Sequence, residues 1–156
     1  MCWEGKANNK KVAKRNIPVK KVLYKNNKSP FQGFLYENGK EYQRELDIHM
    51  KWKYDTEKPS GISIGSGLHC YSNKCRVNEL VDYGEEYICI FRPIFSSISS
   101  FLKYVVGGDS RWFSLIQYDK KHHKMVKGFI PVGSTYYENK HGEIVTEKLI
   151  LAIPKE

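Results

Sequence analysis

Apolar and polar residues alternate in short segments of this chain, and many segments end at a glycine, a proline or an Asn-Gly pair. Ile48, Met50 and Trp52 recur with a period of two, which indicates one face of a β-strand and not of a helix. Asn38-Gly39 is a two-residue hairpin signal, because both positions tolerate a positive φ. Glycines clustered around Gly67 interrupt a further strand pattern and predict a bend. We therefore expect a chain folded mainly into strands, predicted at 17–25, 44–60, 86–95, 111–119, 125–138 and 144–153.

Two segments predict short helices. Within residues 75–84, Val77, Leu80 and Val81 fall on one face at helical spacing. Residues 96–108 repeat the pattern, and a pair of glycines ends the segment. The predicted fold class is therefore α+β, with a mainly antiparallel curved sheet of about seven or eight strands and one or two short helices.

The positive charge is concentrated near the N-terminus. The 156 residues carry a formal net charge of +9. Residues 1–28 contain nine basic residues and a single acidic residue, Glu4. We expect residues 1–16 to form a flexible basic arm and residues 17–156 a single compact α+β domain. Such a field attracts phosphates, nucleotides, nucleic acid or acidic proteins. No recognised nucleic-acid-binding pattern follows the basic stretch, so nucleic acid is not the favoured partner.

Several classes of protein are excluded or disfavoured. No run of 18 apolar residues is present, and the N-terminus lacks the apolar segment of a secretory signal, so a cytoplasmic protein is expected. Cys2, Cys70, Cys75 and Cys89 form no CxxC pair and no recognised zinc spacing. We therefore predict reduced thiols, no metal and no cofactor.

The clearest candidate site is the segment 67–74, read as a strand that leads into a helix. Alternation places His69 and Tyr71 on one face, opposite the core-facing Leu68 and Cys70. The start of the predicted helix would offer free amides to an anion. The residues expected to bind a phosphate-bearing ligand here are His69, Tyr71, Ser72, Lys74 and Arg76. The alternative is that His69 is a structural histidine and Tyr71 a packing aromatic.

Two weaker candidates lie later in the chain. Arg111-Trp112 pairs a cation with an aromatic ring that could stack on a base, and it follows two flexible glycines. Ser134 and Tyr136 follow a Pro-x-Gly corner from which both side chains could reach a ligand. Turn formation alone also explains this second segment.

Six segments together resemble a group of small uncharacterised proteins from gut Bacteroidales-type bacteria and their phages. They are 17–23, 29–31, 36–42, 67–71, 130–137 and 142–149. The resemblance covers about residues 15–153, and residues 96–124 match least. It implies a compact domain of phage or mobile-element origin, hence a location in the host-cell cytoplasm, and it implies no accepted mechanism.

A more distant resemblance is to ADP-ribosyltransferase-like domains, which carry a first-strand Arg or His, a middle-strand Ser or Tyr and a late-strand Glu. The matching first-strand positions here are Lys21 and Tyr24, and the late-strand acid is Glu143 or Glu147. The resemblance implies that Tyr24 is a further ligand-binding residue. No Arg or His stands in the first strand, and this departure affects transferase activity more than the binding of a nucleotide-derived ligand.

These observations favour a non-enzymatic binding protein that captures a phosphate-bearing, nucleotide-derived ligand. The most specific version of this prediction is a phage counter-defence sponge, a protein that sequesters a host immune signalling nucleotide without altering it. An ADP-ribosyltransferase-like or NAD-derivative-processing enzyme is the first alternative, and a protein-binding inhibitor of an acidic host factor is the second. A homo-oligomer with a site between subunits stays open.

Overall fold

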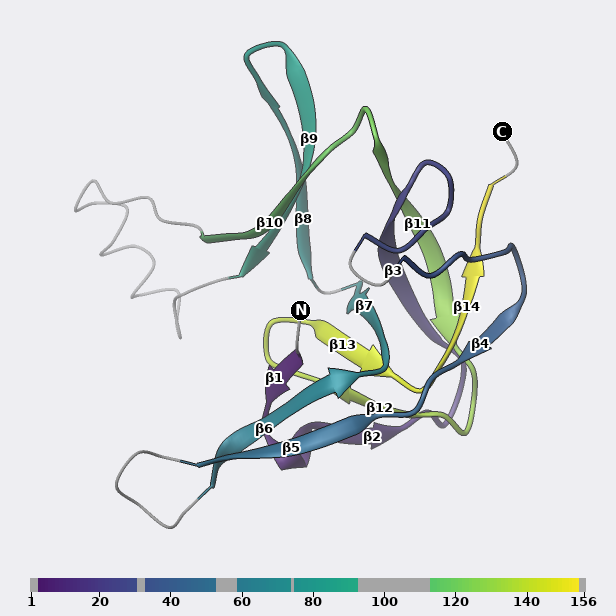
Figure 1. The fold of residues 1–156 in the computed structure, drawn as a ribbon, viewed down its shortest axis with the longest axis vertical. Coiled ribbons are helices and arrows are strands. Elements are labelled where there is room, and N and C mark those ends of the chain that lie inside the picture. Colours follow the sequence, from purple (N-terminus) through teal and green to yellow (C-terminus); the bar gives the residue numbers. More distant parts are fainter. Residues whose placement is uncertain (1–2, 31–32, 53–58, 74, 93–112, 155–156) are drawn as a thin grey trace, which may run out of the picture. The chain divides into compact units, whose positions relative to one another are not determined.

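The computed structural model describes residues 3–30, 33–52, 59–73, 75–92 and 113–154, and antiparallel strands dominate it (Figure 1). In the described ranges the one helical segment is a short 3-10 turn, η1 (Ala7–Asn9). The strands are β1 (Trp3–Gly5), β2 (Lys10–Val12), β3 (Ile17–Tyr24), β4 (Glu41–Gln43), β5 (Asp47–Trp52), β6 (Pro59–Ser66), β7 (Leu68–Ser72), β8 (Arg76–Asp82), β9 (Glu85–Arg92), β10 (Phe113–Asp119), β11 (His123–Ile130), β12 (Thr135–Glu138), β13 (Glu143–Thr146) and β14 (Lys148–Ala152).

The chain divides into two compact units. The large unit is formed by Met1–Lys74 and His123–Glu156, and the small unit by Cys75–His122. The sequence had predicted one compact domain over residues 17–156. Within the described part of the chain, no helix is long and apolar enough to cross a bilayer.

An eight-stranded antiparallel sheet, in the order β2-β12-β13-β7-β3-β11-β14-β4, forms the large unit's main layer. Each strand alternates between two faces, so one residue in two can be buried on the same side. The residues that do so meet in one apolar cluster, the main core, with contributions from β12 at one side to β4 at the other. Leu68 and Cys70 belong to this core, as the alternation along their strand predicted.

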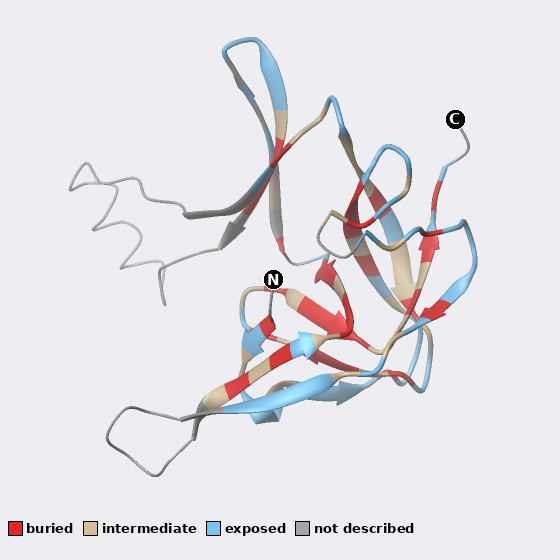
Figure 2. Cartoon of the chain, in the orientation of Figure 1, coloured by how far each residue is buried: buried red, intermediate tan, exposed pale blue. Residues whose placement is uncertain are grey.

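A second sheet, in the order β1-β6-β5, packs on the other face of the large sheet. Ile62 and Ile64 of β6 meet Tyr137 of β12 and Val145 of β13 there. Figure 2 shows buried residues alternating with more accessible ones along β6, as expected for a strand with one packed face. The two sheets are joined where β6 continues into β7 at Gly67.

The segment predicted to be a flexible arm, residues 1–16, contributes two strands and η1. Strand β1 pairs with β6, and β2 pairs with β12. Trp3 is 2% exposed, lies 5.7 Å from Tyr137 ring to ring, and donates from Nε1 to the carbonyl oxygen of Glu143 at 2.8 Å. A buried indole with a satisfied N–H anchors this segment to the sheet.

The predicted helix at 75–84 is wrong, and with it the α+β fold class, because this segment is strand β8. It pairs with β9 in register from Arg76–Phe91 to Asp82–Glu85, and β10 completes a sheet of order β10-β9-β8 in the small unit. Tyr83 and Gly84 form the two-residue turn, with φ of 49° and 79°. Two successive positive φ values suit a tight hairpin and not a helix end. The other predicted helix, 96–108, lies outside the described residues.

Gly67 is the residue whose replacement we expect to damage the fold most specifically. Its φ is +141°, and a Cβ there would lie 2.6 Å from Leu46 Cδ2 and 2.6 Å from Val145 Cγ2. We expect Gly67→Ala to lower the free energy of unfolding by about 2–4 kcal/mol, through backbone strain and overpacking. Gly65→Ala is the matched control, because nothing lies within 4 Å of its Cβ position. Urea denaturation of both variants tests this, and equal losses would contradict it.

Candidate functional site

The outer face of the β3–β11 pair, which points away from the main core, carries the most ligand-like surface in the large unit. The antiparallel register places residues of the two strands directly opposite each other. We call the six residues of this face the outer ladder: Tyr24 opposite His123, Val22 opposite Met125, and Lys20 opposite Lys127. Along the ladder an aromatic pair, an apolar pair that includes the buried Val22, and a cationic pair therefore follow one another.

The aromatic pair lies where β3 ends and β11 begins. The rings of Tyr24 and His123 are 4.6 Å apart, centroid to centroid, and tilted by 30°. Tyr24 is 37% exposed, so part of its ring surface remains accessible. An accessible aromatic face stabilised by a neighbouring ring is a stacking surface for a planar ligand.

The cationic pair adds charge to the same face. Lys127 is exposed and lies opposite Lys20, so the register places two amines on neighbouring strands. Lys25 and Lys28 are exposed in the turn that follows Tyr24. The small unit contains six basic and six acidic residues, so the whole net charge of +9 lies in the large unit. An anion on the outer ladder would therefore meet a favourable field.

A second group of polar atoms lies inside the main core. Lys21 is 5% exposed, donates a hydrogen bond from Nζ to the carbonyl oxygen of His69, and has its Nζ 5.5 Å from the centre of the Tyr36 ring. Burial lowers the pKa of Lys21 to about 8, although the neighbouring Cys70 opposes this shift. The Tyr36 hydroxyl is buried and has no hydrogen-bond partner among the described residues. Burial raises the pKa of Cys70 to about 12, so its thiol stays protonated.

His69 is held neutral by its surroundings. Burial, and next the positive charge of Lys21, lower its pKa to about 4. Its Nε2 is buried and has no hydrogen-bond partner in the part of the chain that the structure describes. A neutral, enclosed imidazole of this kind does not attract a phosphate.

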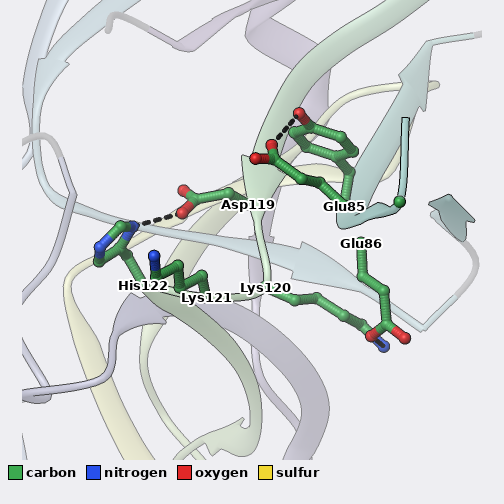
Figure 3. Close-up of a pocket in the computed structure, with 8 residues that line it drawn as sticks. Glu85, Glu86, Asp119, Lys120, Lys121 and His122 are labelled. Carbon is green, nitrogen blue, oxygen red and sulfur yellow. Dashed lines mark hydrogen bonds and ion pairs between the residues drawn. The ribbon is translucent and has the colours of Figure 1, made fainter. Parts of the chain in front are cut away.

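The small unit contains a hollow of about 580 Å³ between the β8–β9 turn and the β10–β11 turn (Figure 3). Lys120 Nζ lies 2.6 Å from Glu79 Oε2 and 3.7 Å from Glu86 Oε2, and the hydrogen bond to Glu79 raises the pKa of Lys120. His122 Nδ1 contacts the Asp119 carboxylate. A further hydrogen bond of 2.8 Å runs from the Tyr87 hydroxyl to Glu85 Oε2. These charged groups pair with each other, so the hollow offers an anion little net field.

The structure places the predicted site residues in different environments. Tyr71 and Ser72 of β7 are buried, at 9% and 8% exposure, and no helix follows them to present free amides. Ser134 is fully buried and Tyr136 belongs to the main core. Lys74, Arg111 and Trp112 lie outside the described residues, and for Arg76 only the backbone, on β8, is described. His69 is half-buried, which leaves Tyr24 as the predicted residue on an exposed surface.

Glu143 and Glu147 are the two predicted candidates for the late-strand acid. Glu147 Oε1 accepts a hydrogen bond from the backbone N–H of Thr135 at 2.9 Å, which ties it to the sheet. Glu143 lies on β13 opposite Tyr71. The residues that sequence reasoning missed are His123, Lys20 and Lys127, because only the pairing of β3 with β11 brings them to Tyr24.

No protein-family model, no curated protein and no solved structure matches the chain. Among the described residues, no group of three or more His, Cys, Asp or Glu side chains is arranged to hold a metal ion. The outer ladder is therefore judged on its own geometry and charge.

We expect the stability contributed by Lys21 to depend on pH. Below pH 8 the amine is charged in the folded and the unfolded chain alike, so the core holds a costly charge. Between pH 8 and 10.5 the folded chain releases this proton while the unfolded chain keeps it. Stability therefore rises with pH in this window, by about 2–3 kcal/mol relative to a variant without the amine.

Denaturation of the wild type and of Lys21→Met at several pH values from 7 to 10.5 measures this difference. Above pH 9 the Cys70 thiol ionises in the unfolded chain but stays protonated in the folded chain, which lowers stability as the pH rises. This effect occurs in both proteins, so it cancels in the comparison. A wild-type-minus-variant difference that stays flat across the window would show that folded Lys21 keeps its proton there, and hence that burial does not lower its pKa.

Proposed function

We propose that the large unit is a non-enzymatic binding module for a phosphate-bearing, nucleotide-derived ligand, held on the outer ladder. The observation that carries this proposal is one face of the β3–β11 pair on which a stacked Tyr24–His123 pair and a Lys20–Lys127 pair occur together, with the exposed Tyr24 and Lys127 at its two ends and the buried Val22 between them. An aromatic surface and a cationic surface on the same pair of strands match the two chemical parts of a nucleotide. Binding of this kind requires no proton transfer and no covalent step.

The aromatic pair supports the recognition of a base. A base stacked on an aromatic side chain contributes about 1–3 kcal/mol, and the contribution hardly depends on which base is bound. The 37% exposure of Tyr24 leaves ring surface for such a stack. His123 behind it, at 4.6 Å, limits the directions in which the tyrosine ring can turn.

The lysine pair supports the recognition of phosphate. Lys20 and Lys127 are opposed in the register, so an anion bound between the two strands would lie near both amines. Lys25 and Lys28, beside the aromatic pair, extend the cationic surface. The net charge of the large unit also favours the approach of an anion from a distance.

The distance between the two pairs restricts the ligand class. Lys20 precedes Tyr24 by four residues on β3, which separates their Cα atoms by about 13 Å. A nucleoside alone cannot reach from the aromatic pair to the lysine pair. A nucleoside polyphosphate or two linked nucleotides can, and these are the ligands we expect.

Titration calorimetry with adenosine, AMP, ATP and a cyclic dinucleotide tests the proposal. We expect the last two to bind more tightly than the first two. Tyr24→Ala should weaken binding about 5-fold to 100-fold through loss of the stack. Lys127→Glu should weaken it about 10-fold or more, because a charge-assisted contact becomes a repulsion.

Lys140→Glu is the matched control, because Lys140 is an exposed lysine in the turn before β13 and the change in net charge is the same. It should alter affinity less than about 2-fold through long-range electrostatics alone. Equal effects of Lys140→Glu and Lys127→Glu would reject the outer ladder as the site. Mass spectrometry of the recovered ligand separates the alternatives, since an altered ligand would indicate an enzyme. Binding of none of the four would favour a protein partner.

A further inference from the structure

Strand β5 is an open edge of the β1-β6-β5 sheet. It pairs with β6 on one side, and no described strand pairs with it on the other. Figure 2 shows the described part of β5 as exposed. Among the side chains of β5 that the structure describes, two are large, apolar and exposed: Ile48 at 44% and Met50 at 55%. An exposed edge strand with apolar side chains readily pairs with another strand.

The edges of the eight-stranded sheet differ from β5. Edge strand β2 presents Lys10 and Lys11, both exposed. Edge strand β4 presents Glu41 and Gln43, also exposed. Charged and polar side chains on an edge discourage pairing with another chain. Edge strand β2 exposes one large apolar residue, Val12 at 55%, whereas β5 exposes Ile48 and Met50, two positions apart on one face.

The apolar side chains of β5 continue the packed face of their sheet. Ile48 lies opposite Ile64, and Met50 opposite Ile62. Ile62 and Ile64 are buried in the cluster between the two sheets, at 4% and 0% exposure. Ile48 and Met50 therefore lie on the same face, beyond the rim of that cluster, and a strand added at this edge would extend its cover.

We propose that β5 pairs antiparallel with β5 of a second copy of this chain, about a two-fold axis at His49. In that register Ile48 lies opposite the partner's Met50, and Asp47 lies opposite the partner's Lys51. Each pairing occurs twice, since an interface about a two-fold axis uses the same residues on both sides. The two three-stranded sheets would then form one six-stranded sheet.

The segment 47–51 is complementary to itself, and this selects a second copy over another partner. Opposite charges at opposed positions attract, and the two apolar residues meet each other across the axis. The polar residues Asp47 and His49 alternate with the apolar ones and so fall on the other face of the sheet. A contact limited to one strand edge is small, so the dimer should be weak and concentration-dependent.

Sedimentation velocity from about 10 µM to about 1 mM covers the range in which an interface of this size associates. We expect the weight-average sedimentation coefficient of the wild type to rise with concentration. Asp47→Lys and Lys51→Asp should each weaken dimerisation about 10-fold, because two attractive pairs become repulsive. The double variant Asp47→Lys/Lys51→Asp restores both pairs and should return to within about 2-fold of the wild type.

Disulfide trapping tests the register independently. His49→Cys in a Cys2→Ser background would place a thiol against its own copy across the axis, at a separation a disulfide accepts. Tyr83→Cys in the same background is the control, because Tyr83 is 99% exposed in the small unit. Cys70, Cys75 and Cys89 are free and buried, so they should react slowly.

We expect the His49→Cys dimer to form several-fold faster than the Tyr83→Cys dimer, and Ile48→Lys to abolish the difference. A wild type that stays monomeric at the highest concentration would overturn the proposal. So would equal trapping rates at positions 49 and 83, or a charge swap that fails to restore association. Nucleotide binding is not read out here, so this proposal stands or falls separately from the proposed function.

Discussion

The burial of one face of eight strands in a single apolar cluster is the constraint on which the large unit depends. Residues from β12 at one side to β4 at the other belong to the same cluster, so the sheet must curve around it. The opposite face is then divided. Strands β12 and β13 are covered by the β1-β6-β5 sheet, while β3 and β11 carry the outer ladder on theirs. Gly67 allows this arrangement, because there one strand leaves the smaller sheet and enters the larger.

The main core tolerates an amine because several groups surround it. Lys21 occupies a core-facing position between Cys70 of β7 and Val126 of β11, donates to the His69 carbonyl and lies over the Tyr36 ring. The lowered pKa of about 8 reduces the free energy needed to keep it neutral there. Below pH 8 the amine is charged, and this positive charge helps to hold His69 neutral. A basic residue near the N-terminus is thus part of the core, while its neighbour Lys20 belongs to the outer ladder.

The two units differ in net charge as well as in their sheets. The small unit has no net formal charge, and at its hollow Lys120 forms ion pairs with Glu79 and Glu86 while His122 contacts Asp119. The large unit holds the whole excess of positive charge, and part of it lies beside exposed aromatic rings. A binding surface for an anion is therefore better supported on the large unit than in the hollow of the small one.

Local patterns in the sequence determined most strands, because a period of two is visible without knowledge of any partner. Strand β3, the bend at Gly67 and the corner before β12 follow from such patterns. The conformation of residues 75–84 was decided only by the tertiary structure. Their apolar spacing suits a helix, but the Tyr83-Gly84 turn and pairing with β9 make the segment a strand. Asn38-Gly39 forms a turn, yet β4 after it pairs with β14. Lys20 and Lys127 of the outer ladder are more than a hundred residues apart in the sequence. No local periodicity specifies which residues of β3 and β11 lie opposite each other. Burial of the shared core selects that register.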